Sequence, residues 1–166
     1  MPNGVNNRSQ SYYIATAMQR CECCHRSTPV IGLFLARGHE TLQTGLQSNR
    51  DASVTDIWET AEDGALLFDV AYLPDAVHLR LRQFFRHYHK NADGETPLSS
   101  WLNHCSFCGE AQADFDLYCE PEGAFSPISP EAAKNICLFE IEEAFEAQAA
   151  GYAYAPAFLG YAQDLT

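Results

Sequence analysis

Two Cys-x-x-Cys pairs constrain what this chain can fold into. Cys21 and Cys24 form the first pair, and Cys105 and Cys108 form the second. A Cys-x-x-Cys turn, or knuckle, bends the backbone so that both sulfurs face one point about 2.3 Å away, which is the Zn–S bond length. Two knuckles supply the four thiolates of a tetrahedral Zn²⁺ shell, with no position left for water. The sequence therefore predicts one structural Zn²⁺ bound by these four cysteines.

The segment between the two knuckles is long. It spans roughly 80 residues, against roughly 15–20 in a compact zinc ribbon. Because loop-closure entropy grows only logarithmically, the added length costs about 1.4 kcal/mol. Structural zinc contributes on the order of 10 kcal/mol. We therefore predict a single zinc-binding domain over residues 11–166, with a long insertion at 38–100, preceded by a flexible, polar N-terminal segment at 1–10.

Further thiols and imidazoles lie close to the knuckles. Cys23 stands inside the first pair, while His25 and His104 each adjoin a knuckle. Such histidines either bind the metal or donate hydrogen bonds to the thiolates, and the sequence leaves both roles open. Cys119 and Cys137 have no partner at ligand spacing, so we expect them in the hydrophobic core.

Residue patterns predict strands on both sides of the first knuckle. Apolar and β-branched residues fill 12–20 and 28–36, which predicts a hairpin with the knuckle at its tip. Further strands are expected at 65–72 and 136–141. Polar, turn-rich composition predicts connections at 38–53 and 91–100, and no periodicity is apparent over 149–161.

One main amphipathic helix is expected over about 75–90. Val77, Leu81, Phe84 and Tyr88 recur at helical spacing, and Pro74 suits its start. Short helices are expected within 109–117 and at 130–133, where Ser129 can cap the first turn. The predicted fold class is α+β, with a zinc-ribbon or treble-clef-like nucleus and additional short strands.

Charge is unevenly distributed along the chain. The formal net charge is −12, and residues 91–166 hold thirteen acidic side chains against Lys134 alone. Such a field repels phosphate backbones, so we expect a protein partner and disfavour nucleic acid. One alternative stays open: Arg82, Arg86 and Lys90 repeat every four residues along the predicted helix, and that basic face suits either phosphates or the chain's own acidic half.

Other function classes find little support in the sequence. No apolar run approaches the roughly 20 residues of a membrane span, and residues 1–10 lack a basic-then-apolar signal pattern. A reducing cytoplasm is therefore expected, where cysteines favour metal over disulfides. There is no glycine-rich phosphate loop and no His-Glu-x-x-His motif. Acidic pairs such as Glu142-Glu143 are typical of a solvated face, so we predict no enzymatic activity; a reactive Cys23 thiol beside the metal is the alternative.

The residues around both knuckles also resemble a known set of sequences. Cys21-x-x-Cys24-His25-x-x-Thr28-Pro29-Val30 and Trp101-x-Asn103-His104-Cys105-x-x-Cys108-Gly109 are similar to paired segments of uncharacterised bacterial proteins. Asp114-Phe115-x-Leu117 and Gly123-Ala-Phe125-x-Pro127 continue the second segment. The resemblance implies a zinc-ribbon or treble-clef-like domain and no particular activity. This chain departs from the pattern at Glu22-Cys23, where an aromatic–basic pair is usual, and at Ala113, where glycine is usual.

Overall fold

The computed structural model describes residues 4–45, 55–90, 100–154 and 163–164. Its described part is mostly β-sheet, with three short helices. The elements in chain order are β1 (Asn7–Ser9), β2 (Tyr12–Arg20), β3 (Ser27–Leu35), β4 (Glu40–Gly45), β5 (Thr55–Thr60), β6 (Ala65–Tyr72), α1 (Asp75–Phe84), β7 (Tyr88–Lys90), β8 (Trp101–His104), β9 (Ala111–Gln112), α2 (Asp114–Tyr118), α3 (Pro130–Ala133), β10 (Cys137–Ile141), β11 (Phe145–Tyr154) and β12 (Gln163–Asp164).

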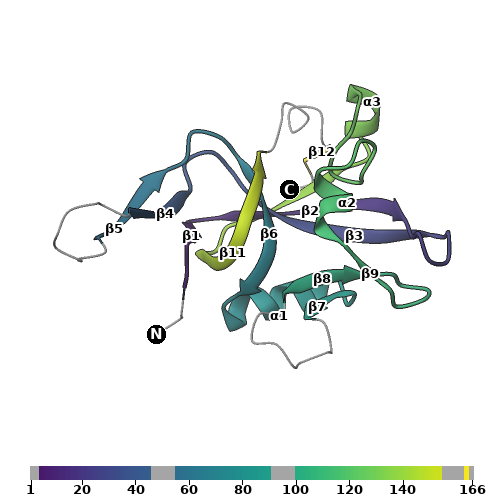
Figure 1. Cartoon of the computed structure of the whole chain (residues 1–166), viewed down its shortest axis with the longest axis horizontal. Coiled ribbons are helices and arrows are strands. Elements are labelled where there is room, and N and C mark those ends of the chain that lie inside the picture. Colours follow the sequence, from purple (N-terminus) through teal and green to yellow (C-terminus); the bar gives the residue numbers. More distant parts are fainter. Residues whose placement is uncertain (1–3, 46–54, 91–99, 155–162, 165–166) are drawn as a thin grey trace.

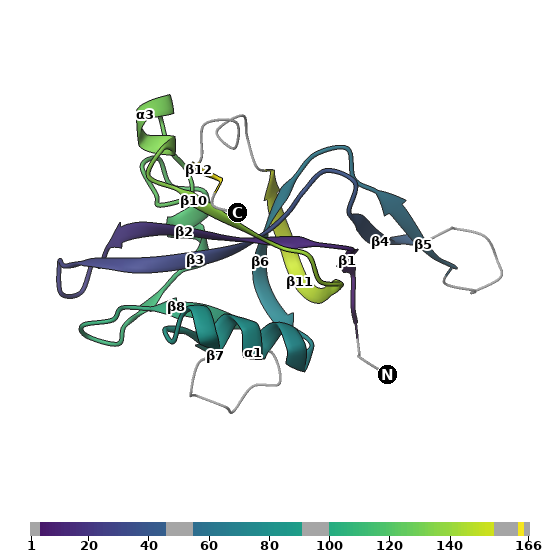
Figure 2. The ribbon, with the colours of Figure 1, turned by 180° about the vertical axis from the view of Figure 1, so that it is seen from behind.

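The strands form one large sheet and one small sheet. The large sheet has nine strands in the order β12-β10-β2-β3-β6-β11-β1-β4-β5, antiparallel throughout except for the short β10–β12 pair. The small sheet has three antiparallel strands in the order β7-β8-β9. In Figure 1, α1 and the small sheet lie on one side of the crossing strands β2, β3 and β6, and α2 and α3 lie toward the other. Figure 2 shows the same arrangement from behind.

The middle of the large sheet is buried on both faces. Along β3, Ile31, Leu33 and Leu35 belong to a core that also holds residues of α1, β7 and β8. Val30 and Phe34 belong to a second core on the opposite face, formed with residues of α2 and α3. Because a strand alternates its side chains between faces, a strand covered on both sides must be apolar nearly throughout. That requirement explains the continuous apolar run of β3.

Strand β6 changes its alternation at Asp69. Leu66 faces the second core and Leu67 the first, yet Val70 also faces the first core, three residues later. Asp69 has a positive φ of 47°, and the register between β6 and β11 shifts close by, between Gln148 and Ala149. An irregularity of this kind turns the strand and removes one N–H from the regular ladder. The Asp69 N–H is therefore free to bond elsewhere.

The long amphipathic helix predicted over 75–90 is wrong. Helix α1 ends at Phe84, and Phe85 already has extended geometry, with φ −157° and ψ 115°. Tyr88 is buried, but it reaches the core from β7, where it pairs with Asn103 of β8. Pairing with β8 thus outweighs the helical periodicity, as tertiary context often does. Val77 and Leu81 are buried on α1, as expected, but Phe84 is 43 % exposed, so only the first part of the predicted apolar stripe is a buried helix face.

Several other expectations are corrected, and several are confirmed. Within the segment expected to be flexible, β1 pairs with both β11 and β4, so Asn7–Ser9 belong to the sheet. The predicted insertion at 38–100 supplies β6 to the middle of the large sheet. The expected connection at 38–53 contains β4, and β11 extends into the stretch at 149–161 as far as Tyr154. The predicted strands at 12–20, 28–36, 65–72 and 136–141 are confirmed. The expected linker at 91–100 lies almost wholly outside the described residues.

Candidate metal centre

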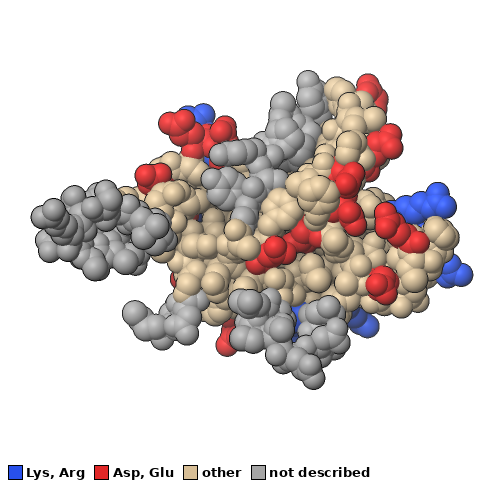
Figure 3. All heavy atoms as spheres, in the orientation of Figure 1, with Lys and Arg blue, Asp and Glu red and all other residues tan. Residues whose placement is uncertain are grey.

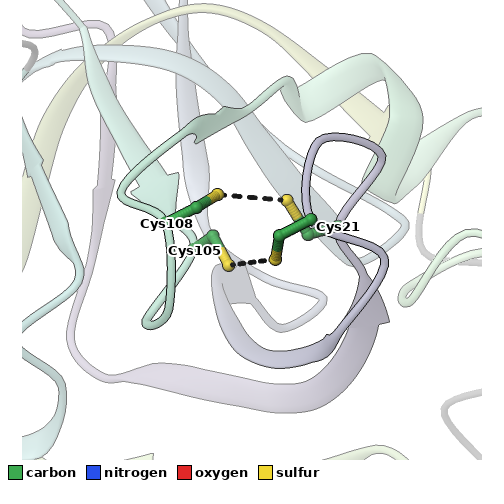
Figure 4. Close-up of side chains that lie close together, drawn as sticks. Cys21, Cys105 and Cys108 are labelled. Carbon is green, nitrogen blue, oxygen red and sulfur yellow. Dashed lines mark hydrogen bonds between the residues drawn. The ribbon is translucent and has the colours of Figure 1, made fainter.

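The four cysteines predicted from spacing lie together in the fold. Each knuckle is the turn of a hairpin: β2–β3 carries Cys21 and Cys24, and β8–β9 carries Cys105 and Cys108. The four Sγ atoms all lie within 4.8 Å of one another. Across the knuckles, Sγ of Cys21 is 3.7 Å from Sγ of Cys108, and Sγ of Cys24 is 3.6 Å from Sγ of Cys105. Figure 4 shows Cys105 and Cys108 on one loop, with their sulfurs directed toward the loop of Cys21.

The two knuckles have the same backbone conformation. His25 N donates to Cys21 O at 2.8 Å, and Gly109 N donates to Cys105 O at 2.9 Å. Each first cysteine donates its own N–H to the carbonyl oxygen five residues later, at 2.9 and 2.8 Å respectively. The residue after each second cysteine has a positive φ, 63° at His25 and 80° at Gly109. A residue in the left-handed conformation closes each turn. His25 takes this place in the first knuckle, so the backbone turn alone explains why it lies next to Cys24.

Polar contacts dock one knuckle hairpin onto the other. Ile31 N donates to Oδ1 of the buried Asn103 at 2.8 Å, and Nδ2 of Asn103 donates to Ile31 O at 2.8 Å. Closer to the sulfurs, Ser106 N donates to Oγ1 of the buried Thr28 at 3.0 Å. Buried polar groups of this kind cost free energy unless they are paired, so these bonds favour one relative placement of the two knuckles.

Two further donors point at the sulfurs themselves. Nε2 of Gln112 lies 3.5 Å from Sγ of Cys21 and also donates to Glu110 O at 2.9 Å. Phe107 N lies 3.4 Å from Sγ of Cys105. Donors aimed at sulfur favour the thiolate form and orient metal ligands. The donor set therefore suits a metal that binds thiolates.

The pKa values of the cysteine thiols are shifted in different directions from the ordinary thiol value. Burial raises the pKa of Cys105, but the backbone N–H groups of Cys108 and Phe107 outweigh it and bring that pKa to about 6. The Cys24 N–H, ahead of other contributions, lowers the pKa of Cys21. Backbone donors also lower the pKa of Cys108, but burial and the neighbouring sulfurs raise it to about 12. Four thiolates this close repel one another, and a divalent cation relieves that repulsion.

The other candidate ligands stand outside the group of four sulfurs. Cys23 and His25 are exposed, and neither belongs to it. His104 is buried and stacks on His89 with ring centroids 3.8 Å apart, while neither of its ring nitrogens has a hydrogen-bond partner among the described residues. The expectation that Cys119 and Cys137 are core residues is wrong, because Cys119 is exposed and Cys137 only half-buried. Cys119 directly follows α2, and Cys137 is the first residue of β10.

Asp114, at the start of α2, is a structural residue that spacing alone does not reveal. Its Oδ2 accepts a hydrogen bond from Asp69 N at 2.9 Å, so it pairs the N–H left free in β6. Its Oδ1 is buried without a partner in the described part of the chain. Burial, ahead of other contributions, raises the pKa of Asp114 to about 7. The carboxyl thus joins the segment after the second knuckle to the large sheet.

In comparisons with known proteins, no family model, no curated protein and no solved structure matches the chain. Among the described residues, no helix has the length and apolar character needed to cross a membrane.

Proposed function

We propose that this protein is a structural zinc-binding protein that acts as a non-enzymatic protein-interaction module. One Zn²⁺ would be held by Cys21, Cys24, Cys105 and Cys108. The observation that carries the proposal is the pair of sulfur separations across the knuckles, 3.7 and 3.6 Å. A tetrahedron with Zn–S bonds of about 2.3 Å has edges of about 3.8 Å, so these separations fit a sulfur-only shell.

A closed sulfur shell supports a structural role for the metal. When bound, Zn²⁺ supplies a cross-link between the β2–β3 and β8–β9 hairpins and offsets the charge of their thiolates. Four protein ligands leave no position for water or substrate, whereas catalytic zinc sites keep one open. Cys23 is exposed, and its sulfur does not belong to the group of four sulfurs that would bind the metal. This arrangement favours interaction over catalysis.

The charge distribution supports a protein partner rather than nucleic acid. The basic spacing that motivated the nucleic-acid alternative does not lie on one helix: Arg82 is on α1, Arg86 follows its end, and Lys90 is in β7 with Nζ 4.6 Å from the centre of the Trp101 ring. Figure 3 shows acidic side chains gathered over the part of the molecule that carries α2 and α3. A partner with basic groups suits such a surface.

Thiol chemistry supports a reducing compartment. All seven cysteines of the chain are free thiols in the structure, including the exposed Cys23 and Cys119. Unpaired thiols persist where glutathione and thioredoxin keep them reduced, and they are oxidised outside the cell. A cytoplasmic location is therefore part of the proposal.

Substitution of the metal with Co²⁺ tests the sulfur shell, and affinity capture tests the interaction. Four thiolates should give intense sulfur-to-cobalt charge-transfer bands and tetrahedral d–d bands, and Cys105→Ser should weaken them. Fewer than three sulfur ligands would instead support an open, catalytic site. For the interaction, tagged wild-type protein should retain a partner from the source cell that the Cys105→Ser variant loses. Retention of nucleic acid alone would favour the alternative function.

A further inference from the structure

A groove lies between the end of β2 and the connection from α2 to α3. Its volume is about 640 Å³. Met18 of β2 forms part of one side, and Ala124, Pro127 and Ile128 contribute the apolar surface opposite. Glu122 also lines it. None of these residues belongs to the metal centre, so the groove is a separate feature of the fold.

Two large apolar side chains of the groove are exposed. Ile128 is 67 % exposed, the highest value among the large hydrophobic residues in the described ranges, and Met18 is 56 % exposed. Single exposed hydrophobic residues are common on protein surfaces. Here two lie in one concavity, and apolar side chains that converge in a concave site are typical of binding surfaces.

The loop that carries this surface is held in place before any partner arrives. Ala124 N donates to Oε1 of Gln19 at 2.9 Å, which ties the loop to β2. Phe125 is buried, and its N–H donates to Leu117 O at 2.9 Å. Gly123 lies so close to α2 that an added Cβ would be 2.3 Å from Asp116 O. A groove built on such contacts loses little conformational entropy when a ligand binds.

The charge around the groove is negative. Glu122 lines it, while Glu120 and Glu131 are exposed on the adjoining loop and on α3. Lys134, which follows α3, is the one lysine or arginine among the described residues of 100–154. The acidic side chains over α2 and α3 are visible in Figure 3. An occupant with lysine or arginine beside an apolar side chain therefore complements both the shape and the charge of the groove.

We propose that this groove is the docking site of the interaction module and that it binds a basic peptide segment of a partner protein. One or two apolar side chains of the peptide lie between Met18 and Ile128. Flanking lysine or arginine side chains face Glu122 and Glu131. The inference rests on the proposed function and names the surface and the chemistry of the partner.

Selection of random short peptides displayed on phage, against the immobilised full-length zinc-loaded protein, tests the proposal. Enriched peptides should combine an apolar residue with lysine or arginine on either side. In fluorescence anisotropy, the double variant Met18→Ser/Ile128→Ser should bind them about tenfold or more weakly. The matched control Leu79→Ser/Ile57→Ser changes two residues that are 58 % and 44 % exposed on α1 and β5, and it should bind like the wild type.

A charge-reversal pair separates electrostatic attraction at the groove from general attraction to an acidic protein. Glu122→Lys/Glu131→Lys should weaken binding about tenfold, and Glu59→Lys/Glu62→Lys, on exposed residues of β5 and the loop after it, should weaken it much less. Equal losses in the two variants would contradict docking at the groove.

Other outcomes would overturn the proposal in distinguishable ways. Enriched peptides that bind the Met18→Ser/Ile128→Ser variant as well as the wild type would place the docking site elsewhere, and the interaction function would survive. A wild-type dimer in light scattering that this variant converts to a monomer would make a second copy of the chain the occupant. No enrichment of basic peptides would refute docking at the groove. The interaction function would not be refuted, because affinity capture from cells tests it separately.

Discussion

The side chain of Asn103 and the backbone of Ile31 form a closed pair of hydrogen bonds between the two knuckle hairpins. Both bonds are 2.8 Å long, and Asn103 is fully buried. The amide therefore continues the hydrogen bonding of β3 onto β8 at a place where the two strands are not paired. Placement of the second knuckle against the first depends on this contact.

Replacement of Asn103 by alanine should destabilise the protein by about 2–4 kcal/mol, because the N–H and C=O of Ile31 both lose their buried partner. Zinc affinity should fall as well, since the knuckles lose part of their alignment. Chemical denaturation and competition with a zinc-binding dye measure the two effects. Asn135→Ala, at an exposed asparagine, is the matched control and should change neither. An Asn103→Ala protein of wild-type stability would show that the amide does not hold the hairpins together.

The left-handed residues that close the knuckles predict opposite responses to substitution. Gly109→Ala should lower the free energy of unfolding by about 1 kcal/mol, because nothing lies within 4 Å of the added Cβ and only the backbone is strained. His25→Gly should retain one bound metal and leave stability unchanged or raised by up to about 1 kcal/mol. Thermal unfolding and metal analysis measure both variants. Loss of metal from His25→Gly would identify His25 as a ligand.

Asp114 should make stability fall as the pH rises. Its pKa is about 7 in the folded protein, against an ordinary value of 3.8, so the folded state holds a proton that the unfolded state releases over this range. Its contribution thus decreases between about pH 4 and pH 7, by about 4 kcal/mol at most. Asp114→Asn keeps an acceptor for the Asp69 N–H and cannot ionise. The stability of this variant relative to the wild type should therefore rise from pH 4 to pH 7.

Denaturation at a series of pH values, with excess zinc for both proteins, isolates the effect of Asp114 from protonation of the cysteine ligands. Asp116→Asn, at the half-buried neighbour in α2, is the control and should follow the wild-type profile. Parallel profiles for wild type and Asp114→Asn would contradict the role assigned to this carboxyl.

A side chain at position 123 should lower the free energy of unfolding. An added Cβ would lie 2.3 Å from Asp116 O and 2.8 Å from Leu117 O, and both atoms belong to the backbone of α2. Gly123→Ala should therefore cost about 1–3 kcal/mol and displace the loop that lines the groove. Gly38→Ala, at an open position with φ +97°, should cost only about 1 kcal/mol. Equal costs at the two positions would mean that the loop moves away without strain.

The sequence predicts the cluster of four cysteines better than it predicts the fold around it. Spacing identifies all four cysteines because a knuckle is a local structure, and the strands beside the first knuckle have a clear β composition. Tyr88 fits a helical repeat equally well, and only its pairing with Asn103 assigns it to a strand. Strand β11 is rich in alanine and has no strong period. Asn103 and Asp114 act through contacts with Ile31 and Asp69 that are distant in sequence, so no local pattern reveals them.

Metal content combined with thermal unfolding tests the sulfur-only centre most directly. Protein purified without added chelator should contain one zinc per chain, and Cys23→Ser should contain the same amount. Cys105→Ser should lose most of the metal, and strong chelator should lower the melting temperature of the wild type toward that of Cys105→Ser. Protein that contains no metal, and whose melting temperature is unchanged by chelator and by Cys105→Ser, would contradict the proposed zinc centre.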